Sequence, residues 1–252
     1  MTRVHSRLSG SKIEPYKVMI YLGAVLGCLA ENYGANQLGL NSVHVLFATL
    51  LFFTLALVGA RLFFVATHWP VYRRNPRRIL DRKEGGMALY GGLPLSLLLS
   101  WLLLRTMGIP IGLFADLTAI GILVGMIFGR LGCFLHGCCC GRETTSRFGI
   151  YLPNQQGVWR RRIPTQILET CLAAGLLIGA LALWKYRPFS GFLFIYSVAG
   201  YAAGRYLLEP TREHQERIGK IRIHRAISVL LIALSIMVFV IELAVRSSLI
   251  RV

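Results

Sequence analysis

Two stretches of the sequence place arginines where a phosphate group can be bound. In "AGYAAGRYLLEPTRE", residues 199 to 213, Arg205, Glu209 and Arg212 are spaced at i, i+4 and i+7 and therefore share one helical face. Arg130 follows the apolar run "GILVGMIFG" and precedes a glycine-rich segment. A guanidinium stays charged and donates two parallel hydrogen bonds, which suits a phosphate. We expect arginines from two helices to clamp one phosphate. The alternative is an ion pair that only ends a helix.

Cysteines crowd the stretch "GRLGCFLHGCCCGR", residues 129 to 142. Cys133, His136, Cys138, Cys139 and Cys140 offer soft metal ligands, and adjacent cysteines can also oxidise. A structural zinc site normally uses two separated ligand pairs, whereas these candidates fall within eight residues. We interpret the cysteines as small, polarisable packing residues and predict no metal or cofactor, with a metal site and a disulfide as the alternatives.

Two further stretches have the composition of unusual helix ends. In "EGGMALYGGLP", Gly91 and Gly92 follow Tyr90, so the backbone there can approach a ligand closely. In "RRIPTQILET", Gln166 and Glu169 lie on one face of a helix that begins near Pro164. By default Pro164 is a helix start signal and Glu169 a partner of the helix dipole.

These residues have to be positioned by membrane helices. The chain is 55% hydrophobic and 15% charged, and its mean hydropathy is +0.57, a composition typical of membrane proteins. A membrane span needs about 20 apolar residues. Seven runs qualify, at approximately 17–34, 44–66, 88–106, 109–129, 164–184, 188–208 and 226–245. Glu31 ends the first run and Asp116 interrupts the fourth. With no cleaved signal and no repeat, we predict one multi-pass membrane domain over residues 1–252.

Basic residues are unevenly distributed along the chain, which carries 28 Lys and Arg against 11 Asp and Glu. Most of them flank the spans on the side that also holds the N-terminus. The positive-inside rule would place that side in the cytoplasm, unless the charges bind anionic lipid. We interpret residues 69–86 as a basic interfacial loop or arm and residues 130–163 as a loop with a short extramembrane region. No nucleic-acid-binding module is recognisable, so we predict no nucleic-acid partner.

Taken in order, these stretches resemble the prolipoprotein diacylglyceryl transferase family, from about residue 16 to residue 212. "YKVMIYLGAVLG" is similar to the family's "YGLM...LG", "VGARLFF" to "GGRIGY" and "GGMALYGGL" to "GGMSFHGGL". "GRLGCFLHGCCCGR" resembles the signature "GRxGNFxNGExxGR", "IPTQILE" resembles "HPSQLYE", and "GRYLLEPTR" resembles "FRxxxEfxR". Each match alone is weak, but six in this order with seven spans are specific.

The resemblance implies an all-α integral membrane enzyme with about seven transmembrane helices around a lipid-binding cavity. Such an enzyme transfers the diacylglyceryl group of phosphatidylglycerol to the lipobox cysteine thiol of a prolipoprotein, forming a thioether and releasing glycerol 1-phosphate. The resemblance implies that Arg130 and Arg205 are the two essential arginines. The supporting and substrate-binding positions that it implies are Tyr16, Tyr90, Gly91, Gly92, Gly141, Gln166, Glu169, Glu209 and Arg212.

The sequence departs from the family pattern at four positions. Tyr90 replaces a histidine, Cys133 and His136 replace asparagines, and Cys138 replaces a glutamate. A candidate proton acceptor is therefore lost, and we hypothesise that His136 or Glu209 takes over, since imidazole titrates in the right range. Two alternatives stay open. The protein can be a paralogous phospholipid-dependent transferase with another acceptor, or a non-catalytic lipid- or metal-binding membrane protein.

The resemblance also implies a location. Family enzymes act in the bacterial plasma (inner) membrane at the outer leaflet, with the N-terminus outside, which would put the basic side and the site outside as well. This disagrees with the positive-inside rule, and we follow the family because arginines that bind substrate or headgroups do not report topology.

Overall fold

A computed structural model describes residues 14–73, 89–153, 158–213, 217–218 and 221–250. The long helices in these ranges are α2 (Pro15–Gln37), α3 (Ser42–Thr67), α5 (Leu89–Thr106), α6 (Ile111–His136), α7 (Thr165–Ala182), α8 (Phe192–Leu208) and α9 (Ile223–Ile250). The short helices are α4 (Trp69–Tyr72) and a 3-10 turn, η3 (Glu209–Thr211). Each of the seven predicted apolar runs therefore contains a helix.

The helices have the length and composition of membrane spans. Among the described residues, α2, α3, α6, α7 and residues Ile223–Ser248 of α9 are long and apolar enough to cross a membrane. Large apolar side chains also face outward, for example Val229, Leu230 and Ile236 on α9, as expected of a surface that contacts lipid. The prediction of a mostly helical membrane protein is confirmed.

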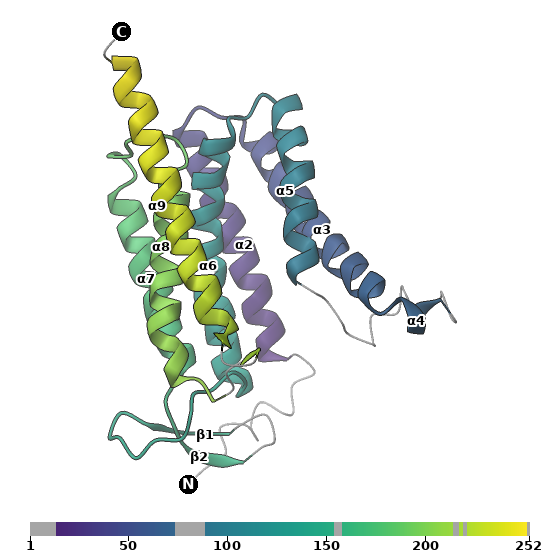
Figure 1. Ribbon diagram of the computed structural model, residues 1–252, viewed down its shortest axis with the longest axis vertical. Helices are drawn as coiled ribbons and strands as arrows, with labels where there is room; N and C mark the ends of the chain where they lie inside the picture. The colour runs from purple at the N-terminus through teal and green to yellow at the C-terminus, as the bar shows by residue number, and fades with distance from the viewer. Residues whose placement is uncertain (1–13, 74–88, 154–157, 214–216, 219–220, 251–252) are drawn as a thin grey trace. The chain divides into compact units, whose positions relative to one another are not determined.

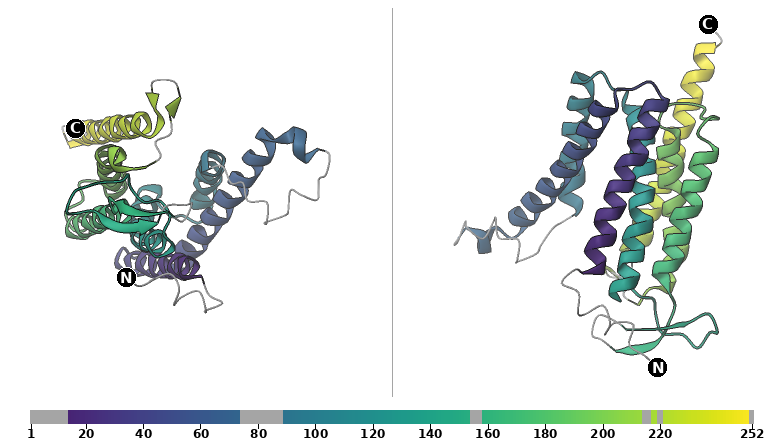
Figure 2. Two further views of the ribbon diagram at one scale, coloured as in Figure 1. Left: turned by 90° about the horizontal axis from the view of Figure 1, so that it is seen from below. Right: turned by 180° about the vertical axis from the view of Figure 1, so that it is seen from behind.

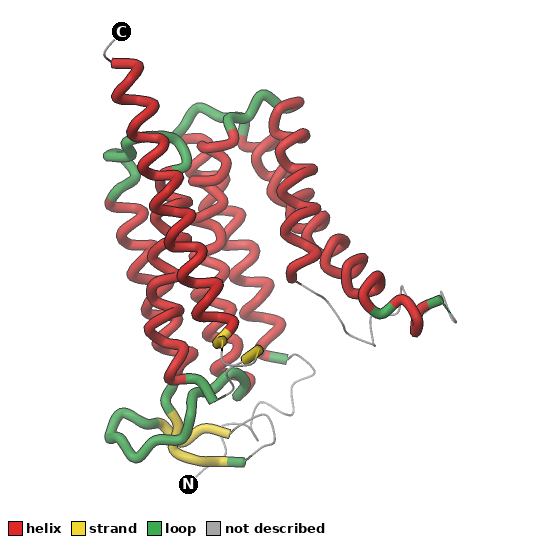
Figure 3. The backbone as a smooth tube through the Cα atoms, in the orientation of Figure 1, coloured by secondary structure: helices red, strands yellow, loops and turns green. Residues whose placement is uncertain are grey.

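Two small sheets are an addition to the predicted helices. Strand β1 (Ile150–Pro153) pairs antiparallel with β2 (Trp159–Arg162), with Ile150 opposite Arg162. Strand β3 (Arg217–Ile218) pairs antiparallel with β4 (Ile221–Arg222). Along the chain, β1 and β2 lie between α6 and α7, and β3 and β4 lie between η3 and α9; Figure 3 shows the β1–β2 hairpin beyond the end of the helices. These segments are too short and too polar to give a clear apolar period, so the sequence did not reveal them.

Packing divides the chain into two compact units, which we describe separately. The first contains Met1–Glu31 and Ala115–Val252, and the second contains Asn32–Phe114. In the first unit α2 and α9 begin, and α6 and α8 end, at the same end of the helices, where the β1–β2 hairpin also lies (Figures 1 and 2). The prediction of a single membrane domain stays a prediction.

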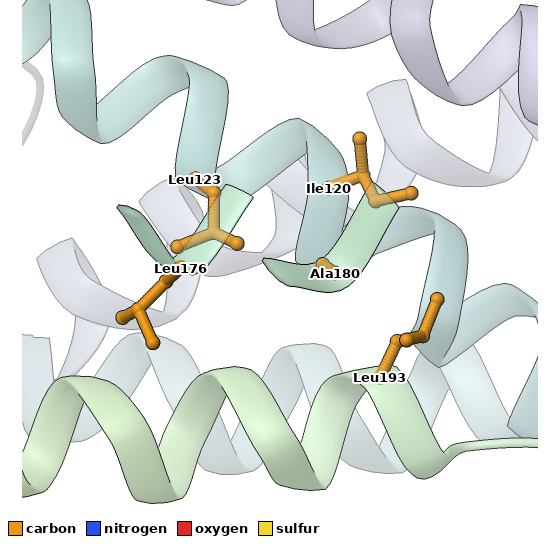
Figure 4. Packing of buried hydrophobic residues seen from close by; sticks show 5 residues of the cluster. All are labelled: Ile120, Leu123, Leu176, Ala180 and Leu193. Carbon is orange, nitrogen blue, oxygen red and sulfur yellow. The ribbon is translucent and has the colours of Figure 1, made fainter. Parts of the chain in front are cut away.

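The core of the first unit is formed by α6, α7 and α8. Ile120, Leu123, Leu176, Ala180 and Leu193 pack together there (Figure 4). Glycines on α8 allow close approach, because a Cβ on Gly200 or Gly204 would lie only 2.4 or 2.3 Å from a leucine side chain of α7. This confirms the expectation that the small residues before Arg205 admit a second helix.

Asp116 interrupts the fourth apolar run for a structural reason. Its carboxylate is fully buried and accepts hydrogen bonds from the backbone N–H groups of Leu193 (2.8 Å), Gly191 (2.9 Å) and Phe194 (3.2 Å). These are orphan donors at the start of α8. Asp116, which belongs to α6, therefore caps the N-terminus of α8. Arg187 Nη1 lies 3.4 Å from Asp116 Oδ2 and neutralises the charge of this carboxylate.

Two helices extend beyond the predicted runs. The first run was expected over approximately 17–34, with Glu31 at its end, but α2 continues to Gln37. The Glu31 side chain is buried against Gly121, where a Cβ would lie 2.1 Å from its Oε1. The fourth run was expected to end at residue 129, but α6 continues to His136. The predicted loop over 130–163 thus begins at Gly137, whose φ of 77° ends the helix.

In the second unit α3 packs against α5. Asn41 caps α3, since its Oδ1 accepts hydrogen bonds from the N–H groups of Val43 and His44 at 3.0 and 3.3 Å. The predicted basic arm over 69–86 begins with α4, and its residues from 74 onward lie outside the described ranges.

Candidate functional site

The predicted arginines meet at the end of the first unit where α6 and α8 end and α7 begins. Arg130 lies in the last two turns of α6, Glu169 in the second turn of α7, and Arg205 in the last turn of α8. Glu209 and Arg212 follow directly in and after η3. Elements that are far apart in the sequence thus contribute charges to one cluster.

Glu169 is the centre of this cluster. Its side chain is 1% exposed, and its carboxylate forms ion pairs with three guanidiniums. Arg130 Nε contacts Oε2, while Arg205 Nη1 (3.3 Å) and Arg212 Nη2 contact Oε1. The residues alone indicated a partner for the helix dipole at Glu169, and the resemblance implied a supporting or substrate-binding position. In the structure its carboxylate orients all three arginines.

The end of α8 explains how two of these arginines converge. Arg205 Nη2 lies 3.0 Å from Oε2 of Glu209, as the i, i+4 spacing predicted. Pro210 cannot continue an α-helix, so the chain tightens into η3 and Arg212 takes an extended conformation with φ −77° and ψ 147°. Arg212 therefore does not share a regular helical face with Arg205, but its side chain still reaches Glu169.

Tyr201 also belongs to the site, although the sequence reasoning missed it. Its hydroxyl lies within hydrogen-bonding range of the Arg130 guanidinium, which can donate to the phenol oxygen. Tyr201 stands one helical turn before Arg205 on α8, and this spacing is the signal that could have identified it.

Gly141 is held between two segments that lead into α7 and out of η3. Its N–H donates to Ile163 O at 3.0 Å, and the neighbouring N–H of Arg142 donates to Thr211 O at 2.8 Å. A Cβ on Gly141 would lie 2.5 Å from Ile163 O and 2.6 Å from Thr211 O. Only glycine fits this position, which accounts for the glycine in the signature.

Residues at the start of α7 fasten the cysteine loop. Gln166 Nε2 donates to the carbonyl of Cys138 at 2.7 Å, and Thr165 Oγ1 donates to the carbonyl of Cys139 at 3.0 Å. Gln166 and Thr165 are 2% and 1% exposed. In this structure Gln166, which the resemblance placed in substrate binding, positions the loop.

The loop thiols have unequal acidities. The pKa of Cys139 is lowered to about 5, chiefly because the thiol of Cys133 donates a hydrogen bond to it, with further contributions from Cys138, Arg130 and Arg212. Burial raises the pKa of Cys138, and the charge of Cys139 raises it further. Burial also raises the pKa of Cys140, whose Sγ donates to Oε2 of Glu213 at 3.7 Å. Cys139 is therefore the thiol that most readily becomes a thiolate.

Tyr16 and His136 lie next to each other at the edge of the site. Their ring centroids are 5.7 Å apart, and Tyr16 packs beside Gly132, where a Cβ would lie 3.3 Å from Tyr16 Cδ2. His136 is exposed on the last residue of α6. It is not among the residues that contact the buried Glu169.

The glycines around Tyr90 occupy the first turn of α5 in the second unit. Tyr90, Gly91 and Gly92 are helical in the backbone, whereas the sequence indicated an irregular helix end. Their side-chain surroundings lie outside the described features, so their predicted role in substrate binding stays a prediction.

Arg162 is a second residue that the sequence reasoning did not single out. It is 1% exposed and forms ion pairs with Glu143 Oε1 at 3.3 Å and Glu213 Oε1 at 2.7 Å. It ties β2 to the segment before β1 and to the chain after η3, so it stabilises the part of the chain that carries Gly141.

The comparisons agree with the motif order. A family model described as "Prolipoprotein diacylglyceryl transferase" matches residues 3–241. Proteins named phosphatidylglycerol–prolipoprotein diacylglyceryl transferase from Bacillus cereus (strain B4264) and Bacillus anthracis (strain A0248) are each 29% identical to this chain over 251 residues. The protein of that name from Bacillus mycoides (strain KBAB4) is 28% identical over 251 residues. Each match covers 96% of this chain and 92% of the relative. The chain belongs to the prolipoprotein diacylglyceryl transferase family.

Proposed function

We propose that this protein transfers the diacylglyceryl group of phosphatidylglycerol to the thiol of a prolipoprotein lipobox cysteine. Relatives named for that activity match nearly its whole length. The observation that carries the proposal is the convergence of Arg130, Arg205 and Arg212 on the buried Glu169. Three guanidiniums against the carboxylates of Glu169 and Glu209 leave one net positive charge, which suits an anionic phosphate.

The reaction makes one bond and breaks one. The acceptor sulfur bonds to the glyceryl carbon as the carbon–oxygen bond to phosphate breaks, and the thiol proton passes to a base. The released glycerol 1-phosphate carries the bonding electron pair on its phosphate oxygen. Arginines already oriented by Glu169 stabilise that growing charge more than the ground state, which is the condition for catalysis. We assign this role to Arg130 and Arg205.

One guanidinium atom supports anion binding at this site. Arg212 Nε is buried and has no acceptor among the described residues. A buried donor without a partner costs about 1–3 kcal/mol or more when it is charged. A phosphate oxygen beside Arg212 would accept a hydrogen bond from this Nε and remove the cost. Phosphate binding would therefore also stabilise the buried guanidinium.

A groove between α8 and α9 supports a lipid as the donor. It has a volume of about 720 Å³, and Val229 and Leu230 line its apolar part. Tyr206, Arg222 and Arg225 line the remainder, and the guanidinium of Arg225 lies 4.9 Å from the centre of the Tyr206 ring. An apolar groove with arginines beside it matches the acyl chains and phosphate of a phospholipid.

The base that accepts the thiol proton is His136 in this proposal. Glu209 is 1% exposed, and its carboxylate is occupied by the ion pair with Arg205. His136 is exposed beside Tyr16, so its imidazole is accessible to the acceptor. Full activity of a His136→Ala protein across pH 6 to 9 would exclude it and return the role to Glu209 or to another group.

We place the site at the outer leaflet of the bacterial plasma membrane, with all seven long helices crossing it around a lipid-binding cavity. In intact cells, an impermeant thiol reagent should then reach the loop that contains Cys138 and Cys139. Labelling of the loop only after the membrane is opened would reverse the orientation.

The decisive experiment is rescue of a transferase-depleted bacterium, together with an assay of the purified protein. We expect transfer from phosphatidylglycerol to a lipobox peptide, abolished by Arg130→Ala or Arg205→Ala. Good expression without rescue, combined with transfer to a different acceptor, would favour the paralogous transferase. Good expression with no transfer at all would favour a non-catalytic membrane protein.

A further inference from the structure

Three thiols gather at the rim of the arginine cluster. Cys133 comes from the last turn of α6, and Cys138 and Cys139 come from the loop that follows. Their sulfur atoms all lie within 4.8 Å of one another. Within the part of the chain that the structure describes, this is the one group of three or more His, Cys, Asp or Glu side chains with metal-binding spacing.

The backbone holds these thiols in place before any ligand arrives. The N–H of Cys138 donates to the carbonyl of Cys133 at 3.1 Å, which closes the end of α6. Cys139 has a φ of 60°, the only positive φ at a non-glycine residue in the described ranges. Such backbone is uncommon and costs about 1–3 kcal/mol. Gln166 and Thr165 hold the carbonyls of Cys138 and Cys139 and so maintain it.

The spacing of the sulfurs fits a thiophilic cation. With metal–sulfur bonds of about 2.3 Å, two thiolates on a tetrahedral zinc ion lie about 3.8 Å apart. The three sulfurs lie within 4.8 Å of one another, so a closure of at most about 1 Å for each pair reaches this geometry. Three protein ligands leave the fourth position open, which is the arrangement of a catalytic rather than a structural zinc site.

We propose that Cys133, Cys138 and Cys139 bind one Zn²⁺ ion whose open position takes the thiol of the acceptor cysteine. This inference rests on the proposed transferase function, because it supplies the nucleophile of that reaction. A thiol that coordinates zinc loses its proton at neutral pH. The site therefore offers a substitute for the signature glutamate and asparagines, which are Cys138, Cys133 and His136 here.

The acceptor thiol binds the metal and releases its proton to water or to His136. Its sulfur then attacks the glyceryl carbon, and the carbon–oxygen bond to phosphate breaks. The charges of Arg130 and Arg212 act on Cys139, and in this proposal these two arginines hold the departing phosphate. The thioether product carries no negative charge on sulfur, so it binds zinc weakly and leaves.

Metal content gives the first test. Protein purified under reducing conditions, stripped with a chelator and reloaded with Zn²⁺, should bind one ion per chain. Cys133→Ser, Cys138→Ser and Cys139→Ser should each weaken binding by about 100-fold or more, since even outer partners of a ligand change affinity 10- to 100-fold. Cys140→Ser and Cys171→Ser are the matched controls and should bind normally. The proposed site would be overturned if all five variants bind Zn²⁺ equally well. It would also be overturned if neither the variants nor the wild type bind Zn²⁺.

The open position is tested separately from turnover. Co²⁺ in place of Zn²⁺ gives a sulfur-to-metal absorption band, which should change on addition of a lipobox peptide and not of its Cys-to-Ser analogue. An Arg205→Ala protein should show the same change without transfer. If this band responds but no variant or wild type transfers lipid, the proposed function fails while the metal site stands. Full transfer by metal-free protein, or a disulfide among the three cysteines in active protein, would overturn the inference.

Discussion

The guanidinium of Arg130 on α6 contacts the carboxylate of Glu169 on α7, and this carboxylate is 1% exposed. Burying a carboxylate is unfavourable unless it is paired, so Glu169 requires its arginines as much as they require it. The same carboxylate holds Arg205 and Arg212. The three cations are thus kept in place without substrate, although like charges repel one another.

Glu169→Gln should disrupt this arrangement while preserving the size of the side chain. Removing one partner of a buried ion pair destabilises a protein by about 3–5 kcal/mol, and here three arginines lose their anion. We expect a clearly lower Tm in detergent and loss of transfer. Glu14→Gln is the control, because Glu14 pairs with Lys17 at an exposed position and such pairs contribute about 0–1 kcal/mol. An unchanged Tm for Glu169→Gln would mean that the cluster does not stabilise the bundle.

Arg130→Lys and Arg205→Lys should each lower kcat about 100- to 1,000-fold with the fold intact, because lysine keeps the charge but not the paired hydrogen bonds. Steady-state transfer to a lipobox peptide measures this. Arg105→Lys is a matched change at the end of another helix, where Arg105 stacks on Trp101 at 4.4 Å. If the lysine variants keep normal kcat, charge alone is sufficient at the site.

Gly141→Ala should abolish diacylglyceryl transfer, and its effect on Tm should be smaller than its effect on activity. The added Cβ would meet Ile163 O and Thr211 O at 2.5 and 2.6 Å, so the segments that position α7 and Arg212 have to separate. Gly175→Ala on α7 serves as the comparison, since a Cβ there meets nothing within 4 Å and alanine favours helix. Transfer assays and melting curves on both proteins decide the matter, and normal activity of Gly141→Ala would contradict the described clamp.

Alkylation should distinguish the loop cysteines by pH in reduced, metal-free protein. The pKa of Cys139 is lowered to about 5, so its reactive thiolate forms above that pH and is lost as the pH falls through it. The pKa values of Cys138 and Cys140 are raised, so both remain thiols at neutral pH. Iodoacetamide at pH 6 to 7 should modify Cys139 first, as resolved by tandem mass spectrometry. Preferential modification of Cys140 would contradict this order.

The sequence by itself determined the helices and the main arginines. Spanning a bilayer requires a continuous apolar length, which is a local property, so all seven runs were predicted and all contain helices. The Arg205–Glu209 pair was also predictable, because i, i+4 neighbours on a helix meet whatever surrounds them. The order of the motifs then indicated the family, which the comparisons confirm.

Only the tertiary structure decided how these elements act together. Glu169 is central because α6, α7 and α8 place three arginines around it, and nothing in the periodicity of "IPTQILET" encodes that approach. Asp116 interrupts an apolar run in the sequence, but in the fold it caps α8. The turn at Gly137 places Cys138 and Cys139 beside Cys133, a proximity of the three sulfurs that sequence spacing alone does not encode. Long-range packing sets these relationships, and a local pattern carries no information about it.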